Sequence, residues 1–456
     1  MYKFTKITAS IGPQSETPDV LMKLIRSGAN AIRLNFSHDT GAVQGDKIDS
    51  VRKISSELNM PVAIIVDLQG PKHRIGDFET DGHYKLVAGQ KFTFDNDRRP
   101  GNSRRVCLPH DDVLQSLRIG DRVLLNDGKI EMRVSDVKPG SVTATVVRGN
   151  EIWSRRGFNL PDTLIDTPVL TPKDIQDLEY AITKDPDFVA VSFVQRASDI
   201  ESVRDFITAR TSKPIKIIAK IERPQALDDL HDIIVASDAV MVARGDLAIE
   251  VPFEQVPSIS RKIIRMCRSM NRPVIMATQM LASMVESEFP TRAEISDVAT
   301  SAYLRVDSTM TSEETTVGIN PTLAIETMAK ILSFADMDTI ANPYDWSDVD
   351  CGADNDWSRS VVSMARLNKS PAIVVFDMDG NTSVEIACRR PDVPVISVCG
   401  SEIVANQLCL SRGVYPIYNP EMFGMRDAFS AVRAFGITYG DIVIADDRKI
   451  SLRTLI

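Results

Sequence analysis

The sequence predicts an α/β protein: a (β/α)8 TIM barrel with an inserted small β-barrel lid domain and a C-terminal α/β domain. Three observations lead to this prediction. Eight short apolar runs recur along the chain, and amphipathic helical stretches follow most of them. One interval between runs, from Asp67 to Phe188, holds about 120 residues, far more than one helix needs. A second series of apolar runs begins after an Asp-rich segment.

The eight runs have the character of buried parallel strands, which are continuously apolar because both faces are covered. They are Lys6–Ser10, Ala31–Asn35, Ala63–Asp67, Phe188–Ser192, Lys216–Ile221, Ala239–Ala243, Val274–Ala277 and Ser308–Thr311. Helical periods between them include Pro18–Ser27, Ile48–Leu58, Ala197–Ala209 and Val256–Met270. Right-handed crossovers place the carboxyl ends of all eight strands on one face. We therefore predict a catalytic barrel over residues 1–70 and 158–340.

The long interval has a composition of its own, and we assign residues 71–157 to the inserted lid domain. Apolar and polar residues alternate in Arg122–Asn126, Ile130–Val134 and Val142–Val147, as in antiparallel strands. Asp81-Gly82, Asp127-Gly128 and Pro139-Gly140 are turn signals. We expect this domain to act as a lid over the active face, and a passive insertion is the alternative.

The C-terminal part begins with a predicted acidic linker at 341–357, which carries two of the three tryptophans. Beyond it, apolar runs alternate with helical stretches at Ala372–Phe376, Val393–Val398, Val414–Tyr418 and Ile442–Ala445. This rhythm predicts a doubly wound α/β domain over 358–456.

Composition excludes several kinds of partner. A net charge of −9 argues against binding to nucleic acid or to an anionic membrane. No apolar run approaches the roughly 20 residues that cross a bilayer, and the first residues lack the apolar stretch of a signal peptide. The six cysteines form no Cys-x-x-Cys pair, so we expect a reduced, cytoplasmic location.

Polar residues follow most of the predicted barrel strands at the point where each strand ends. Lys220 and Glu222 end the fifth run, and Asp246 follows the sixth. Two carboxylates beside one amine can hold a divalent cation and stabilise a transferring phosphoryl group. The alternative is a surface salt-bridge cluster. Polar residues at the other strand ends favour the first interpretation: Arg33, Asn35, Ser37, Asp67, Ser192, Thr278, Gln279, Ser312 and Glu314.

Several short segments, in this order and spacing, resemble those of the pyruvate kinase family over nearly the whole chain. They are Ser10-Ile-Gly-Pro13, Arg33-Leu-Asn-Phe-Ser-His38, Asp67-Leu-Gln-Gly-Pro-Lys72, Asn159-Leu-Pro161, Lys220-Ile-Glu222, Met241-Val-Ala-Arg-Gly-Asp-Leu247, Ala277-Thr-Gln-Met-Leu281 and Pro290-Thr-Arg-Ala-Glu294. The resemblance implies transfer of a phosphoryl group from phosphoenolpyruvate to ADP, giving pyruvate and ATP in glycolysis. It also implies a mobile lid, a regulatory C-terminal domain and a homotetramer.

The resemblance also implies roles for individual residues. Glu222 and Asp246 would hold Mg2+ or Mn2+, and Lys220 would neutralise the transferring phosphoryl group. The remaining catalytic and substrate-binding residues would be Arg33, Arg74, Ser192, Thr278 and the backbone N–H groups of Gly245 and Asp246. The nucleotide would meet Asn35, His38, Arg74 and Arg156.

The resemblance implies a K+ site at Asn35, Ser37, Asp67 and the residue after Asp67, which here is Leu68 and has no side-chain oxygen. Potassium-dependent members carry Glu where this chain has Lys72. Because an ammonium group can supply the charge that K+ otherwise provides, we predict activity without K+. A solvated hinge lysine is the alternative.

The chain departs from the family pattern at other positions. Ala248 stands where the family has a glycine, and its methyl group would strain the backbone if this position has positive φ. Glu313 adds a carboxylate near an anion site. The aligned effector loop is Asp377-Met-Asp-Gly-Asn-Thr382, whose two aspartates would repel a sugar phosphate, so we predict no activation by sugar phosphates.

The sequence is also compatible with two other functions. A metal-dependent lyase or aldolase acting on a 2-oxo acid shares the barrel and the paired carboxylates but needs neither the lid nor Lys72. The altered residues, Ala248 among them, also allow a catalytically silent relative that binds metabolites.

Overall fold

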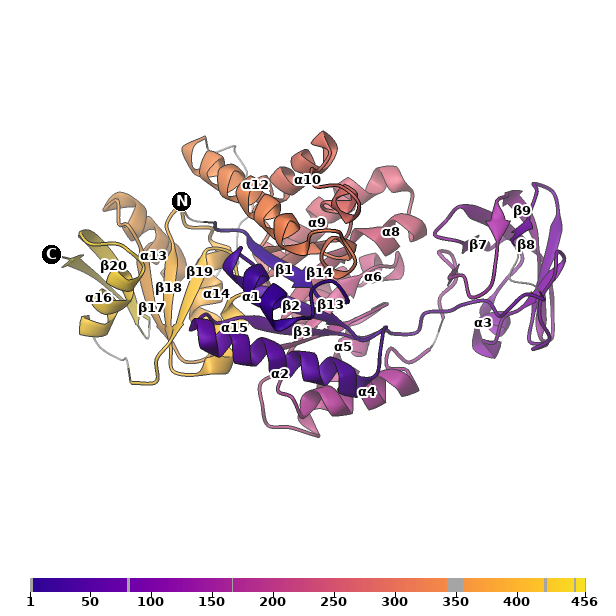
Figure 1. The fold of residues 1–456 in the computed structure, drawn as a ribbon, viewed down its shortest axis with the longest axis horizontal. Helices are drawn as coiled ribbons and strands as arrows, with labels where there is room; N and C mark the ends of the chain where they lie inside the picture. Colours follow the sequence, from indigo (N-terminus) through magenta and orange to yellow (C-terminus); the bar gives the residue numbers. More distant parts are fainter. Residues whose placement is uncertain are drawn as a thin grey trace.

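The structure is a computed structural model, and it describes residues 3–79, 83–165, 167–342, 356–421, 425–446 and 448–455. Three parts follow one another along the long axis (Figure 1). The inserted lid sheet lies at one end, the barrel in the middle and the C-terminal domain at the other end. No helix within these ranges is long and apolar enough to cross a membrane.

The eight predicted runs close into one parallel barrel in chain order. Its strands are β1 (Lys6–Ser10), β2 (Ala31–Asn35), β3 (Ala63–Asp67), β12 (Phe188–Val191), β13 (Lys216–Ile221), β14 (Ala239–Ala243), β15 (Val274–Ala277) and β16 (Ser308–Thr311). β1 closes the barrel by pairing with both β2 and β16. The predicted fold class is confirmed, and all eight carboxyl ends share one rim.

Long helices surround the barrel, and short ones occupy its loops. The long helices are α1 (Pro18–Arg26), α2 (Gly41–Leu58), α4 (Pro172–Ile182), α5 (Ala197–Thr208), α9 (Val256–Ser269), α10 (Arg292–Tyr303) and α12 (Pro321–Ala341). The short ones are α6 (Gln225–Asp228), α7 (Leu230–Ala236), α8 (Arg244–Glu250), η1 (Phe253–Gln255), η2 (Ala282–Val285) and α11 (Glu313–Thr316).

Helix α2 begins at Gly41, seven residues before the predicted start. Gly41 and Gly45 lie in this additional part, and glycine has a low helix propensity. A Cβ atom at Gly45 would collide with the ring of Tyr180 on α4. The absence of a side chain at Gly45 therefore allows α2 to approach α4 closely, and this packing outweighs the low helix propensity of glycine.

The inserted segment forms a six-stranded sheet and a two-stranded sheet over a shared core. The larger sheet has the order β11 (Phe158–Asn159), β7 (Arg122–Leu125), β8 (Ile130–Lys138), β9 (Ser141–Arg148), β5 (Lys91–Asp95), β6 (Arg105–Cys107). The smaller sheet pairs β10 (Glu151–Ile152) with β4 (Tyr84–Lys85), and α3 spans Asp111–Ser116. The predicted turn at Asp127-Gly128 has φ values of 53° and 78°. The turn signal Asp81-Gly82 lies outside the described residues.

The C-terminal domain is a five-stranded sheet flanked by helices, as predicted. Its elements are α13 (Asp356–Leu367), β17 (Ile373–Asp377), α14 (Asn381–Cys388), β18 (Val395–Cys399), α15 (Glu402–Leu408), β19 (Val414–Tyr418), α16 (Met425–Ala434), β20 (Gly440–Asp446) and β21 (Lys449–Leu455). The antiparallel edge strand β21 was not predicted. Residues 343–355 of the predicted linker lie outside the described ranges, and the domain boundaries stay a prediction.

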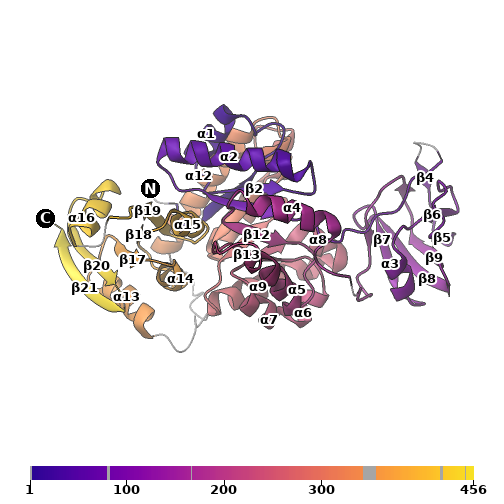
Figure 2. The ribbon, with the colours of Figure 1, turned by 90° about the horizontal axis from the view of Figure 1, so that it is seen from below.

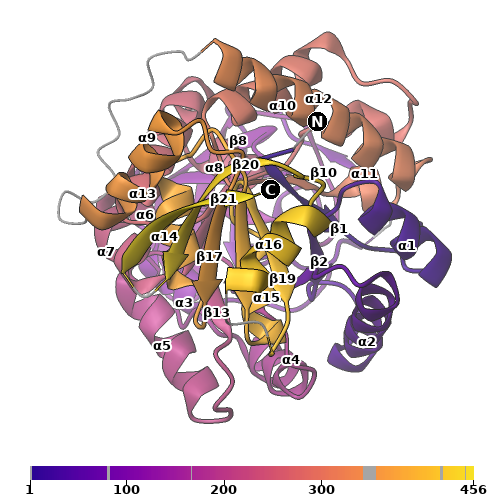
Figure 3. The same ribbon diagram turned by 90° about the vertical axis from the view of Figure 1, so that its left-hand side faces the viewer.

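The C-terminal domain covers the amino-terminal end of the barrel (Figures 2 and 3). Cys409 and Leu410 belong to the same apolar cluster as the residues that fill the barrel interior. A buried ion pair joins Arg390 to Asp307 at 2.6 Å, with both side chains 1% exposed. Because this end is closed, the opposite rim, on the side of the lid, is the one open to substrates.

Candidate active site

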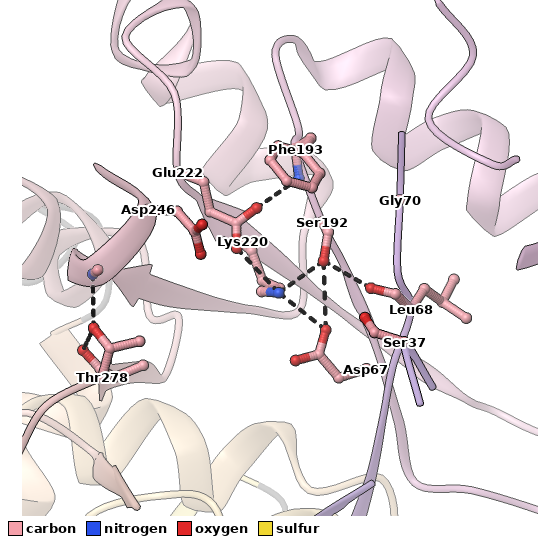
Figure 4. A network of polar contacts seen from close by, with 12 residues as sticks. Ser37, Asp67, Leu68, Gly70, Ser192, Phe193, Lys220, Glu222, Asp246 and Thr278 are labelled. Carbon is pink, nitrogen blue, oxygen red and sulfur yellow. Dashed lines mark hydrogen bonds and ion pairs between the residues drawn. The ribbon is translucent and has the colours of Figure 1, made fainter. Parts of the chain in front are cut away.

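Three strand ends bring Asp67, Ser192 and Lys220 together at the rim (Figure 4). The Nζ atom of Lys220 lies 3.1 Å from Asp67 Oδ1 and 2.7 Å from Ser192 Oγ. Ser192 Oγ in turn donates to the carbonyl oxygen of Leu68 at 2.7 Å. These contacts hold the ammonium group of Lys220, which is 11% exposed, in one place at the barrel mouth.

The buried positive and negative side chains of this cluster compensate each other's charge. Asp67 also accepts a hydrogen bond from Arg33 Nε at 2.6 Å. Burial alone would raise the pKa of Asp67, but the positive charges of Lys220 and Arg33 outweigh it and lower that pKa. Burial alone would lower the pKa of Lys220, but Asp67 and Glu222 outweigh it and raise that pKa. Both groups are therefore charged at neutral pH.

The two carboxylates predicted to bind metal also lie beside Lys220. Glu222 Oε1 is 3.0 Å from Lys220 Nζ, and its Oε2 accepts the backbone N–H of Phe193 at 2.9 Å. Burial raises the pKa of Glu222, Lys220 acts against this, and the negative charge of Asp246 raises it further. Two carboxylates that repel one another in this way form a site suited to a divalent cation.

The donor set fits Mg2+. The described residues contain no group of three or more His, Cys, Asp or Glu side chains arranged around a metal position. Mg2+ commonly takes one or two carboxylates and completes its shell with substrate oxygens and water. Glu222 and Asp246 match that pattern, and Asp246 is 33% exposed, so its oxygens face the open rim.

Thr278 and Gly245 meet on the other side of Asp246. Thr278 Oγ1 accepts the backbone N–H of Gly245 at 2.7 Å and donates to the carbonyl of Ala277 at 2.7 Å. Thr278 has φ +70°, which is unusual for a β-branched residue and is held by the surrounding loop. The Gly245 N–H, which we predicted to receive the substrate carboxylate, is therefore engaged with Thr278 in this structure.

The side chains of two predicted K+ residues, Asn35 and Asp67, already have hydrogen-bond partners within the protein. Asn35 Oδ1 accepts the backbone N–H of Ser37 at 3.1 Å, and Asp67 is 1% exposed between its two cationic partners. Lys72 lies at the same rim, with its Nζ 3.9 Å from Asp246 Oδ1. A lysine charge thus lies next to Asp246, one of the two carboxylates predicted to bind metal.

The predicted nucleotide residues are dispersed. His38 is exposed after β2, and Arg74 is exposed at the base of the lid, where it donates to the carbonyl of Arg155 at 3.1 Å. The Arg156 guanidinium lies over the ring of Trp153, 4.6 Å from its centroid. Within the described part of the chain, neither Arg74 nor Arg156 contacts Lys220, Glu222 or Asp246.

The backbone strain expected at Ala248 is absent from the structure. Ala248 lies in helix α8 without a positive φ, where alanine is about 1 kcal/mol more favourable than glycine. Glu313 is exposed, whereas its neighbour Glu314 is buried and accepts the backbone N–H groups of Leu281 and Ser312.

Sequence reasoning missed Arg244. Its guanidinium forms an ion pair with Asp297 at 2.7 Å and donates to the carbonyl of Thr278 at 2.9 Å, so it supports the Thr278 loop. The sequence could have indicated a role for Arg244, because this residue directly follows the end of β14, as other predicted site residues follow their strands.

The fold and the rim together define a (β/α)8 barrel enzyme with a lysine and two carboxylates at its mouth, a donor set that suits a divalent cation and anionic substrates. The family model "Pyruvate kinase, barrel domain" matches residues 2–325, and "Pyruvate kinase, alpha/beta domain" matches 355–447. The chain belongs to the pyruvate kinase family, whose members transfer a phosphoryl group from phosphoenolpyruvate to ADP in glycolysis and in general depend on Mg2+.

Two individual relatives and one solved structure support this family assignment. A pyruvate kinase of Methylorubrum extorquens is 38% identical over 452 residues, covering 96% of this chain and 93% of the relative. One of Clostridium acetobutylicum is 34% identical, covering 96% and 95%. The crystal structure of a pyruvate kinase from Cryptosporidium parvum superposes with a TM-score of 0.94 at 27% identity, covering 100% of this chain and 96% of that one. Family membership decides for the kinase over the lyase. The relatives that match nearly the whole chain are pyruvate kinases, which favours an active enzyme over the silent relative.

Proposed function

We propose that Lys220 is the central catalytic cation and that Glu222 and Asp246 bind the Mg2+ or Mn2+ ion for phosphoryl transfer. The observation that carries this proposal is the placement of Lys220 Nζ 3.0 Å from Glu222 Oε1, beside Asp246, at the open rim. When bound, the ion neutralises charge on the substrate's carboxylate and phosphate and helps to orient them.

The proposed roles of the side chains follow from how negative charge moves during phosphoryl transfer. The bond between phosphorus and the enol oxygen breaks, a bond to a terminal oxygen of ADP forms, and the enolate carbon takes a proton. Lys220 and Arg33 lie where they can neutralise charge that spreads over the phosphoryl oxygens in a loose transition state. Ser192 accepts a hydrogen bond from Lys220 and thereby orients it. From the family resemblance we assign Thr278 to the position where a water-borne proton reaches the enolate carbon.

The positions of the predicted nucleotide-binding residues support a role for the lid in binding ADP. Asn35 and His38 follow β2 at the rim, whereas Arg74 and Arg156 lie at the base of the inserted sheet. We infer that ADP is bound between these two groups when the lid swings toward the barrel.

The decisive experiment replaces Lys220 by methionine. ADP-dependent release of pyruvate is followed for the wild type and Lys220→Met, with and without Mg2+. Because the lysine charge matters most in the transition state, we expect phosphoenolpyruvate binding to persist while kcat falls by about 1,000-fold or more. A variant that turns over within tenfold of the wild type would refute the proposal.

We also propose that the enzyme works without K+. The support is Lys72, whose ammonium group lies 3.9 Å from Asp246 Oδ1, and the pairing of Asp67 with Arg33 and Lys220, which already neutralises this predicted K+ ligand. Initial rates in a buffer free of K+ and Na+ test this. Activation by K+ of more than roughly tenfold contradicts it, since a tenfold change corresponds to about 1.4 kcal/mol of barrier.

Sugar phosphates are not expected to activate the enzyme. At the start of α14 the backbone N–H groups are already taken by the chain's own carboxylates. Asp377 accepts from Gly380 at 3.0 Å and from Ser383 at 2.6 Å, and Asp379 accepts from Asn381 at 3.0 Å. A phosphate would have to displace two negative charges. A lowered half-saturation for phosphoenolpyruvate on adding a sugar mono- or bisphosphate would overturn this expectation.

From the resemblance we further propose a cytoplasmic homotetramer. Cys107, Cys267, Cys399 and Cys409 are buried thiols without a disulfide, which supports a reducing compartment. Light scattering on the purified protein decides the assembly, and the mass of a monomer or a dimer would contradict the tetramer.

A further inference from the structure

The loop that follows strand β2, residues 35–40, carries two of the residues to which we assigned the nucleotide, Asn35 and His38. We call this segment the β2 loop. Residues 37–40 are exposed. Asn35 Oδ1 accepts the backbone N–H of Ser37 at 3.1 Å, and Asp39 has a φ of 64°. A positive φ is uncommon outside glycine, so the shape of this loop depends on support from the structure around it.

Gln44, near the start of helix α2, supplies part of that support. Its side-chain nitrogen Nε2 donates to the carbonyl oxygen of Asn35 at 3.1 Å and to that of His38 at 3.0 Å. The same nitrogen lies 3.4 Å from Asp39 Oδ2. Gln44 is 4% exposed, so water is not at hand to replace these hydrogen bonds. One buried amide group thus ties the first residue of the β2 loop to the fourth.

The oxygen of the same amide group is unpaired. Within the described ranges, Gln44 Oε1 is buried without a hydrogen-bond partner. An apolar side chain would fill this place without such a cost, because a buried polar atom without a partner is unfavourable. Exchanging the two ends of the amide group would turn Oε1 toward two carbonyl oxygens, so the orientation follows from the surroundings. The donors of Gln44 therefore account for a glutamine at this position better than packing does.

A second donor reaches the β2 loop from helix α4. Lys173 Nζ donates to the carbonyl oxygen of Phe36 at 2.5 Å and forms an ion pair with Asp177. Helix α2 begins close to α4, since a Cβ atom at Gly41 would lie 3.3 Å from Asp177 Oδ1 (Figure 1). Three carbonyl groups of the β2 loop are thus bound by side chains of these two helices, while His38 stays exposed.

We propose that Gln44 is a positioning residue for the nucleotide, because it holds the β2 loop in the shape in which Asn35 and His38 receive ADP. The inference rests on the proposed roles of these two residues. A loop that is already held in its binding conformation spares ADP the cost of ordering it, so the effect should appear in the affinity for ADP. The hydrogen bonds that Gln44 donates in the structure go to the loop, so phosphoryl transfer from bound substrates should continue without them.

The test uses two substitutions of similar size in the full-length protein. Gln44→Met removes both donors, and Gln44→Glu places a carboxylate against the two carbonyl oxygens. Gln255→Met, at an exposed glutamine, is the matched control. Each protein is assayed for kcat and for KM of both substrates, and calorimetry measures the affinity for ADP with Mg2+ in the absence of turnover. The double variant Asn35→Ala/His38→Ala tests the proposed nucleotide residues separately.

We expect Gln44→Met to raise KM for ADP about tenfold, and Gln44→Glu to raise it further, because buried carbonyl groups lose their donors and in the second variant face a negative charge. At saturating ADP, kcat should stay within about threefold of the wild type, and so should KM for phosphoenolpyruvate. Lowering the pH from about 8 to about 6 should return Gln44→Glu toward the wild-type affinity, since a buried carboxyl group takes up a proton readily and can then donate it in a hydrogen bond. Gln255→Met should match the wild type.

The inference is overturned if Gln44→Met and Gln44→Glu both bind ADP within about threefold of the wild type, or if they impair both substrates and kcat equally, as a general loss of structure would. Should Gln44→Glu fail to fold, Gln44→Met decides by the same criteria. The double variant separates two kinds of failure. If it loses affinity for ADP while the Gln44 variants do not, the positioning role alone is wrong. If it keeps that affinity, the proposed nucleotide residues are wrong and the inference falls with them.

Discussion

Substitution of Lys72 offers the sharpest test of how positive charge contributes at the proposed metal site. Lys72 Nζ lies 3.9 Å from Asp246 Oδ1. At that distance two unit charges attract by about 4 kcal/mol with an effective dielectric constant of 20. Lys72 is 38% exposed and Asp246 33% exposed, so solvent screening reduces the effective interaction to roughly 1 kcal/mol.

One kcal/mol corresponds to a factor of about five in rate, so Lys72→Met should lower kcat/KM about fivefold in K+-free buffer. Lys72→Glu reverses the charge, which doubles the effect to about 2 kcal/mol, or roughly 30-fold. K+ should restore the rate of Lys72→Glu and leave the wild type unchanged.

The assay is the initial rate of pyruvate release with tetramethylammonium or K+ as the monovalent cation. Lys53→Glu is the control, because Lys53 is an exposed lysine on α2 remote from the rim. The reasoning fails if Lys72→Glu keeps the wild-type rate without K+, or if K+ activates both proteins equally.

Two further predictions concern stability. Arg390→Met removes one partner of the buried pair with Asp307 and should lower the free energy of unfolding by about 3–5 kcal/mol, measured by urea denaturation; a loss below about 1 kcal/mol would contradict the importance of this contact between the domains. Burial, with help from His110, lowers the pKa of His73 to about 4. Because the unfolded chain then binds the extra proton first, stability should fall as the pH drops from about 6.5 to 4, by up to about 3 kcal/mol. His73→Asn should flatten this dependence, and an unchanged pH profile would refute the assignment.

The barrel could be predicted from the sequence because its strands are buried on both faces and therefore appear as continuous apolar runs. Once eight such runs are recognised, topology places Asp67, Lys220 and Glu222 on one rim without any knowledge of contacts. The strand bounds agree closely for the same reason. The lid strands followed from alternation and from turns such as Asp127-Gly128.

The elements that escaped prediction depend on contacts between distant segments. The start of α2 was hidden because Gly45 has a packing role against Tyr180. The edge strand β21 lies in a stretch with charged residues at both ends, and it is paired along only one edge, with β20. At the site, the hydrogen bond between Gly245 and Thr278 joins loops after different strands. Hydrogen bonds from Arg223 to Leu160 and from Asn159 to Glu250 likewise join the barrel to the segment that follows the inserted sheet. Sequence spacing carries no sign of such bonds.

The most direct measurement is the affinity for Mn2+, followed by electron paramagnetic resonance of the free ion in the presence of phosphoenolpyruvate. Glu222→Gln and Asp246→Asn should each weaken binding by more than the roughly 10- to 100-fold typical of outer-shell changes, whereas Glu313→Gln, at an exposed carboxylate, should bind like the wild type. Wild-type affinity in both Glu222→Gln and Asp246→Asn would show that these carboxylates do not hold the ion.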